Sequence, residues 1–312
     1  MWNRHLHGTL SKLGFQPSIH DPCVYTLKEA NGEYIFLAIV VDDILAASTS
    51  ERLIRRFENN LKKVYTITSL GIPKRLVGLN IVHNPSGLTL DQVQFVKDVA
   101  MQFKQTKSKP VSSPMALGDV PSGASPDLPP GHKYLSLVRP LLWASLTRPD
   151  IAVAVSIACS KSIRPTKADL AAALRILRYL YHTPHIKLTF TRLLSAPLVC
   201  VHVDAAWANA PKSRSRYGYI ICVYGSPVMW ETKCTTMVCL STAEAEYVAA
   251  VHAAKSAIWL SNMSVELCSI APTTITLLED NNACIQMATN PIISGRNRHF
   301  AMRMWWLASR PS

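Results

Sequence analysis

Val201-His202-Val203-Asp204-Ala205-Ala206-Trp207 decides the fold of the C-terminal part of this 312-residue chain. Valines at 199, 201 and 203 precede Asp204, which predicts a strand that is largely covered on both faces and ends at Asp204. Residues 217–224 and 228–232 predict a second and a third strand, joined by the turn signal Gly225-Ser226-Pro227. The stretch therefore opens a sheet.

The residues that follow alternate between helix and strand patterns. A long helix is expected from about 242 to 267, a fourth strand over 274–278 and a short helix over 282–288. Strand, hairpin, helix, strand and helix in this order are typical of an α/β domain with a mixed sheet and flanking helices.

Three carboxylates occupy chemically suggestive places in this region. Asp204 and Asp280 each follow an apolar strand pattern, and Glu246 lies in the first turns of the long helix. A carboxylate there is costly to bury unless it is paired or binds a cation. Brought to one edge of a sheet, the three would form an oxygen-rich site that suits Mg²⁺ or Mn²⁺. Taken singly, each also fits a helix cap or a turn.

Glu244 competes with Glu246 for the role of metal ligand. Ser241-Thr242-Ala243-Glu244 fits a capping box, in which Glu244 bonds back to Ser241. Two residues further on, Glu246 is turned by about 200° around the helix, so the two cannot share a face. We therefore assign the metal to Glu246 and the cap to Glu244.

The N-terminal region contains a second acidic feature. Residues 34–41 form an apolar strand-like run, Asp42-Asp43 interrupts it, and residues 44–47 resume it. This pattern predicts a hairpin with both carboxylates at its tip. Taken by itself, the pair is also compatible with a plain polar turn.

Composition divides the chain into three parts. Residues 1–105 mix strand and helix patterns, as in an α+β domain. Residues 106–195 begin with a Pro/Ser/Gly-rich linker over about 106–133 and continue with helices. Residues 196–312 form the α/β part. Thr166-Lys167-Ala168-Asp169 is typical of a helix start with a capping box.

The charge and the apolar pattern restrict the partners. Lys and Arg total 33 against 20 Asp and Glu, a net charge of +13, which indicates an anionic partner such as nucleic acid. Lys212, Arg214 and Arg216, in a predicted polar loop near Asp204, are candidates for phosphate contacts, and a solvated loop is equally compatible. We expect no membrane span, no signal peptide and no small-molecule cofactor, hence an intracellular protein in the cytoplasm or nucleus.

Motifs in a fixed order link these parts to one family. Val40-Val41-Asp42-Asp43-Ile44-Leu45, Thr147-Arg148-Pro149-Asp150-Ile151, Val203-Asp204-Ala205-Ala206-Trp207, Ser241-Thr242-Ala243-Glu244-Ala245-Glu246-Tyr247 and Glu279-Asp280-Asn281-Asn282 resemble segments of copia-type retrotransposon polyproteins. The resemblance implies a partial reverse transcriptase palm and thumb, a connection and a ribonuclease H domain.

That resemblance also implies roles for individual residues. Asp204, Glu246 and Asp280 would hold two Mg²⁺ ions that cut the RNA strand of an RNA–DNA hybrid, and Asp42 and Asp43 would belong to the polymerase metal site. The family's fourth ribonuclease H carboxylate falls at Ala301 here.

The upstream polymerase Asp has no counterpart, so we expect no DNA synthesis by this chain, which we interpret as a polyprotein fragment. Two functions stay open: a ribonuclease H-type nuclease, and a catalytically dead relic or co-opted protein that binds nucleic acid.

Arg175-Ile176-Leu177-Arg178 matches the Arg-x-Leu-Arg pattern of secreted oomycete effectors. The pattern lies mid-chain within a predicted helix and follows no signal peptide, so we interpret it as part of that helix.

Overall fold

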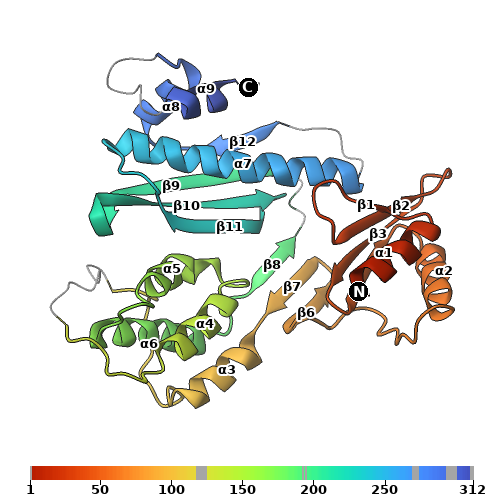
Figure 1. The fold of residues 1–312 in the computed structure, drawn as a ribbon, viewed down its shortest axis with the longest axis horizontal. Helices are drawn as coiled ribbons and strands as arrows, with labels where there is room; N and C mark the ends of the chain where they lie inside the picture. The colour runs from red at the N-terminus through yellow and green to blue at the C-terminus, as the bar shows by residue number, and fades with distance from the viewer. Residues whose placement is uncertain are drawn as a thin grey trace. The chain divides into compact units, whose positions relative to one another are not determined.

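The computed structural model describes residues 2–116, 125–191, 193, 195–268, 274–292 and 301–309. The chain forms two compact units, Met1–Ile81 with Ile258–Thr273, and Val82–Ala257 with Thr274–Ser312 (Figure 1). The predicted domain boundaries at residues 105 and 195 remain predictions, because compactness alone does not measure which part folds independently.

The first unit contains an antiparallel sheet in the order β1-β2-β3-β4. Both of its N-terminal helices contribute to one apolar core with this sheet, through residues such as Leu10, Leu37 and Phe57. The elements are α1 (Trp2–Lys12), β1 (Gln16–Pro17), β2 (Val24–Lys28), β3 (Tyr34–Val40), β4 (Asp43–Ser48) and α2 (Glu51–Lys62).

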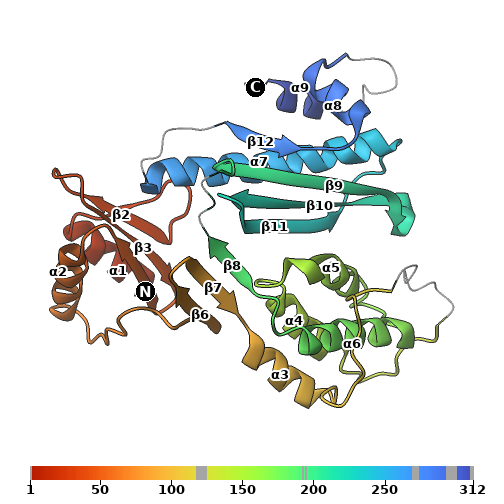
Figure 2. The ribbon, with the colours of Figure 1, turned by 180° about the vertical axis from the view of Figure 1, so that it is seen from behind.

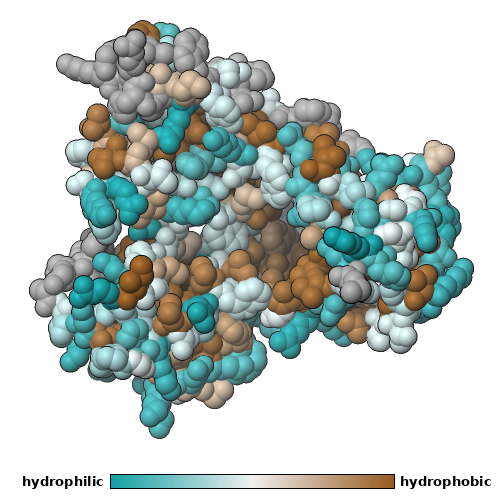
Figure 3. Space-filling model, in the orientation of Figure 1, coloured by the Kyte–Doolittle hydropathy of each residue, from teal (hydrophilic) through white to brown (hydrophobic). Residues whose placement is uncertain are grey.

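The sequence of α2 explains how this helix lies on the sheet. Leu53, Phe57 and Leu61 recur every four residues and are buried, so they form one apolar face. The remaining positions are largely charged or polar, and the corresponding surface is hydrophilic in Figure 3. The helix is therefore anchored by a single stripe.

A cluster of four helices follows in the second unit. α3 (Val93–Gln102), α4 (Tyr134–Ala144), α5 (Ala152–Ser160) and α6 (Lys167–His182) share one apolar core that includes Leu137, Leu141, Ile176 and Leu177. A sheet in the order β5-β6-β7-β8 is formed by β5 (Arg75–Leu76), β6 (Leu79–Asn84), β7 (Gly87–Asp91) and β8 (Leu188–Thr191).

The segment expected as a linker packs against this helical cluster where it is described. Val111, Met115 and Leu128 contact the apolar core. Arg175 of α6 donates to the Ser113 carbonyl at 3.2 Å. These described residues of the predicted linker therefore pack on the helical cluster, because their apolar side chains have a core to join.

The third sheet is mixed, as predicted, in the order β11-β10-β9-β12. Antiparallel pairs join β9 to β10 and β10 to β11, and β12 runs parallel to β9. The strands are β9 (Val199–Ala210), β10 (Arg214–Val223), β11 (Ser226–Cys234) and β12 (Ile275–Leu278). Figure 1 and Figure 2 show α7 (Thr242–Cys268) running along this sheet.

Helix α7 is covered on a second side by α8 (Asn282–Thr289) and α9 (Ala301–Ala308). Tyr247 and Val251 of α7 share an apolar cluster with Cys284 of α8 and Met304 of α9. The Tyr247 hydroxyl donates to the Met304 carbonyl at 3.0 Å. Small residues, mainly alanine, fill much of the buried surface of α7, which lets its neighbours approach closely.

Two expectations about the first strand of this sheet are wrong. β9 does not end at Asp204 but continues to Ala210, because its antiparallel pairing with β10 extends beyond the last residue that pairs with β12. Only one face of β9 is buried: Val201 and Val203 are covered, whereas His202 and Asp204 are exposed. The other predicted elements of this region occur within a few residues of their expected bounds.

Candidate metal site at the end of strand β12

The sheet topology places Asp204 and Asp280 at the same level. Leu278, the last residue of β12, pairs with His202 of the parallel strand β9. Asp280 and Asp204 each lie two residues further along their chains. Because parallel strands advance in the same direction, both acids lie at the carboxyl end of β12.

Glu246 comes to this edge from the start of α7 and is buried, with 6% of its surface exposed. Its Oε2 atom has no hydrogen-bond partner among the described residues. Glu244 has the structural task predicted for it: its Oε2 accepts from the Leu240 amide at 2.7 Å, and its own amide donates to Ser241 Oγ at 3.2 Å. The Glu244 carboxylate thus caps the start of the helix through the amide of Leu240, the residue before Ser241.

Three carboxylates come together in the described part of the chain: Glu246, Glu279 and Asp280 each offer an oxygen, and these oxygens lie within 4.8 Å of one another. Asp204 is not a member of this group. Glu279 is the residue that sequence reasoning missed, although it precedes Asp280 directly. In a continuing strand, adjacent side chains point to opposite faces. β12, however, ends at Leu278, so this alternation does not apply to the two acids.

The electrostatics of the cluster are those of crowded negative groups. Burial, followed by the charges of Glu279, Asp204 and Asp280, raises the pKa of Glu246 to about 8, against a backbone hydrogen bond from Ala205 that lowers it. Burial also raises the pKa of Glu279, with contributions from Asp280 and Asp204. Asp204 therefore lies close enough to act on both glutamates through its charge.

The donor set fits a hard divalent cation. Oε2 of Glu246 and Oε2 of Glu279 are both buried, and neither has a hydrogen-bond partner among the described residues. An unpartnered buried carboxylate oxygen is unfavourable unless a proton or a cation neutralises it. Oxygen-only donor sets of this type suit Mg²⁺ and Mn²⁺.

The three basic candidates have different surroundings. Lys212 is exposed in the short 3₁₀ turn Pro211–Ser213, and Arg214 begins β10 and is half-buried. Arg216 does not lie in a loop as expected: it is a buried residue of β10, and its Nη1 donates to Ser156 Oγ at 2.7 Å. The expected polar loop is shorter than predicted because β9 and β10 both extend into it.

Asp42 and Asp43 lie where the hairpin prediction places them. β3 and β4 pair up to Val40 and Asp43, so Val41 and Asp42 form the turn, and both aspartates are exposed. Val41 has a φ of 57°, which is uncommon for a β-branched residue. The Trp2 indole donates to its carbonyl at 2.9 Å. Neither aspartate belongs to a cluster of three metal-ligating groups among the described residues.

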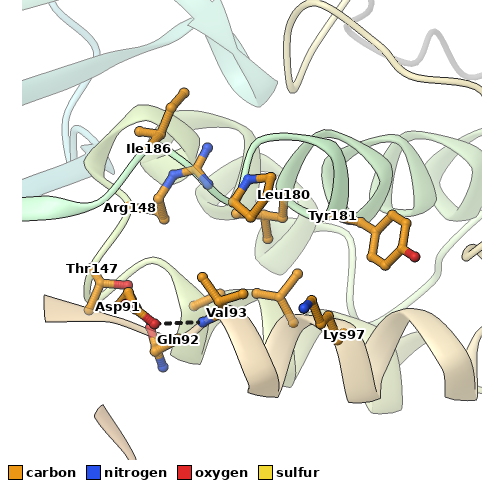
Figure 4. A pocket seen from close by; sticks show the side chains of 12 residues that line it. Asp91, Gln92, Val93, Lys97, Thr147, Arg148, Leu180, Tyr181 and Ile186 are labelled. Atoms are coloured by element: carbon orange, nitrogen blue, oxygen red, sulfur yellow. Dashed lines mark hydrogen bonds between the residues drawn. The ribbon is translucent and has the colours of Figure 1, made fainter. Parts of the chain in front are cut away.

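A small pocket lies in the helical cluster and is lined by residues such as Gln92, Arg148 and Tyr181 (Figure 4). The Arg148 guanidinium uses four of its five N–H donors there. It donates to both Asp150 oxygens at 2.8 and 2.7 Å and to the carbonyl and hydroxyl of Thr183 at 3.1 and 2.8 Å. Arg148 thus joins the Asp150 turn to the end of α6.

The end of the family motif is only partly described. Arg298 and His299, which belong to that motif, lie outside the described residues. Ala301 begins α9 and brings no carboxylate.

Arg175 and Arg178 of the effector-like pattern lie in α6, as the helix interpretation predicted.

No helix in the described part of the chain is long and apolar enough to cross a membrane.

Comparison with known proteins identifies the family. A family model described as reverse transcriptase (RNA-dependent DNA polymerase) matches residues 1–117. The retrovirus-related Pol polyprotein from transposon TNT 1-94 of Nicotiana tabacum is 29% identical over 98% of this chain and 24% of its own length. A Saccharomyces cerevisiae protein named for transposon Ty5-1 is 32% identical, over 80% of this chain and 82% of its own length.

The chain belongs to the copia-type retrotransposon polyproteins and carries a reverse transcriptase region. It spans about a quarter of the length of the tobacco polyprotein. The secreted RxLR effector protein 161 of Plasmopara viticola is 38% identical over 41% of this chain and 91% of its own length. No solved structure matches the chain.

Proposed function

We propose that the region from Val199 onward is a ribonuclease H-type nuclease that hydrolyses the RNA strand of RNA–DNA hybrids with Mg²⁺ or Mn²⁺. The observation that carries this proposal is the buried Glu246 carboxylate. Its Oε2 has no hydrogen-bond partner among the described residues, and one of its oxygens lies within 4.8 Å of oxygens of Glu279 and Asp280. The order of the strands, with Asp204 and Asp280 level at one sheet edge, supports it as well.

In this proposal Asp204, Glu246 and Asp280 hold the ions. When bound, a pair of such ions supplies an activated water and stabilises the charge on the leaving oxygen of a phosphodiester. Glu246 must release its proton before it can bind a cation, since its pKa is raised to about 8. Burial of Glu246 restricts its side chain, so its ligand oxygen is held in place before a cation arrives.

In this proposal, Lys212 and Arg214 contact the phosphates of the hybrid. Lys212 is exposed and Arg214 is half-buried, and both follow the strand that carries Asp204. Such residues contact phosphates without reading sequence. Arg216 is assigned a supporting role, because its guanidinium is committed to Ser156.

For the reverse transcriptase region, we propose that Asp42 and Asp43 are the aspartate pair of a polymerase metal site. Their exposed position at the tip of the β3–β4 hairpin supports this assignment, because a cation and a nucleic acid must both reach them.

A second function is a binding protein without catalysis. Ala301 supplies no carboxylate, which favours this alternative, and the net charge of +13 would still attract a nucleic acid. A chain that keeps the acidic cluster and the positive charge but has lost catalysis would bind nucleic acid without cutting it.

One experiment separates the two functions. The purified chain is incubated with an RNA–DNA hybrid labelled on its RNA strand, with Mg²⁺, Mn²⁺ or EDTA, beside an Asp280→Asn variant. Metal-dependent cutting by the parent that the variant lacks supports the nuclease. Hybrid binding by both proteins without cutting supports the binding protein and contradicts the nuclease.

A further inference from the structure

We infer that Glu279 is a ligand of the cation, so that the inner set of protein ligands is Glu246, Glu279 and Asp280. This inference rests on the proposed cation site and adds to it a residue that the sequence motifs did not select.

The distances support these three residues as the inner set. Their ligand oxygens lie within 4.8 Å of one another, which one bound cation could bridge after small adjustments. Asp204, which is exposed, is not part of that group. Its charge nevertheless raises the pKa of both Glu246 and Glu279, which suits a position beside a second ion.

The Glu279 side chain is held by the start of the next helix. Its Oε1 accepts from the Asn281 amide at 2.9 Å. The Asn281 side chain in turn accepts from the Cys284 amide at 3.0 Å and so caps α8. One carboxylate oxygen is thereby fixed at the helix cap, and the other, Oε2, is buried with no hydrogen-bond partner in the part of the chain that the structure describes.

A second, independent observation points to a ligand at this place. Glu246 is more than nine-tenths buried, and its own Oε2 likewise has no hydrogen-bond partner among the residues described. Two unpartnered oxygens from neighbouring carboxylates repel each other when both are charged. A cation between them would remove that repulsion, whereas a shared proton would relieve only part of it.

The test measures Mn²⁺ binding by the full chain, without any nucleic acid. Mn²⁺ is titrated into the parent, Glu279→Gln and the control Glu58→Gln, and the free ion is followed by electron paramagnetic resonance. Glu58 is a half-buried glutamate of α2 that accepts from Ser69 and belongs to the other compact unit. Glutamine keeps the shape of Glu279 and its acceptor for the Asn281 amide but removes the charge.

We expect Glu279→Gln to weaken Mn²⁺ binding roughly tenfold or more, since even residues that only support a ligand cost about that factor. Glu58→Gln should bind as the parent does. Binding by Glu279→Gln within twofold of the parent would overturn the inference, as would a parent that binds no Mn²⁺ at millimolar concentration.

Melting curves separate a ligand from a merely structural residue. In EDTA, Glu279→Gln should melt no lower than the parent, because the variant loses a repulsive charge; Mn²⁺ should raise the melting temperature of the parent and not that of the variant. If glutamine prevents folding, Glu279→Asp takes its place. It should bind Mn²⁺ more weakly than the parent, and parent-like binding would overturn the inference.

The outcomes also separate this inference from the proposed nuclease. Mn²⁺ binding that needs Asp280 but not Glu279 overturns the ligand role of Glu279 alone. Mn²⁺ binding that needs Glu279, in a chain that cuts no hybrid, sustains that role and overturns the nuclease.

Discussion

Glu246 shows how a single buried acid links stability to pH. Its carboxyl has a pKa of about 8 in the folded chain against an ordinary value of 4.5. Between these values the folded chain keeps a proton that the unfolded chain releases. The contribution of Glu246 to stability is therefore complete below pH 4.5 and is lost as the pH rises to about 8.

This linkage predicts that Glu246→Gln, in EDTA, matches the stability of the parent at pH 5 and exceeds it at pH 8.5. Glutamine resembles the protonated carboxyl and has no charge to lose, and we expect a gain on the order of 2 kcal/mol at the higher pH. Urea denaturation at both pH values measures it. A variant that gains nothing at pH 8.5 relative to pH 5 would contradict the assignment.

The metal and the proton compete for the same carboxyl. Mn²⁺ binding at pH 7 should therefore release a proton, and the affinity should rise as the pH approaches 8. Calorimetric titrations in two buffers of different ionisation enthalpy detect the released proton. Equal heats in both buffers would show that Glu246 is already ionised in the metal-free chain.

At the scale of elements, α6 begins with the capping box that the sequence predicted. Thr166 Oγ1 accepts from the Asp169 amide at 3.2 Å, and Asp169 Oδ2 accepts from the Thr166 amide at 2.8 Å. Both bonds satisfy amides that a helix start leaves without partners. The cap matters for the whole helical cluster, because α6 supplies much of its core.

Thr166→Ala should lower the free energy of unfolding by about 1 kcal/mol or slightly more, since it removes one partner of the cap. Thr166→Ser keeps the hydroxyl and should cost much less, which makes it the matched control. Chemical denaturation of the three proteins compares them. Equal losses in both variants would show that the methyl group, and not the cap, stabilises the helix start.

The elements also show where local patterns misled. The end of β9 depends on β10, a partner that pairs beyond Asp204. Arg216 is polar and close to other basic residues, so its sequence indicated a loop. Its burial depends on α5, which supplies Ser156 as an acceptor. Neither fact is encoded in a window of neighbouring residues.

For the whole molecule, the reverse transcriptase region leads to a prediction about synthesis. The 312-residue chain should not extend a DNA primer on an RNA template with Mg²⁺ or Mn²⁺. Asp42 and Asp43 belong to no group of three metal-ligating side chains among the described residues, and phosphoryl transfer by two metals needs all of its ligands.

An active reverse transcriptase, assayed under the same conditions, serves as the positive control for primer extension. Templated extension by the parent chain that disappears in an Asp43→Asn variant would contradict the prediction, because it would show a working polymerase site.

The sequence by itself determined the family, the alternation of elements from β9 to α8, the β3–β4 hairpin and the α6 cap. These features follow from periodicity, turn residues and motifs, which act over a few neighbouring positions. The sequence also selected Glu246 over Glu244, because helix geometry fixes which residues share a face.

Only the tertiary structure decided which carboxylates meet. Glu279 joins Glu246 because β12 ends just before it and the cap of α8 fixes one of its oxygens, and Asp204 stays outside the group. Such distances arise from strand register and from the packing of α7 and α8, contacts between residues more than thirty positions apart. A local pattern specifies the type of each side chain, but the folded chain sets the spacing between them.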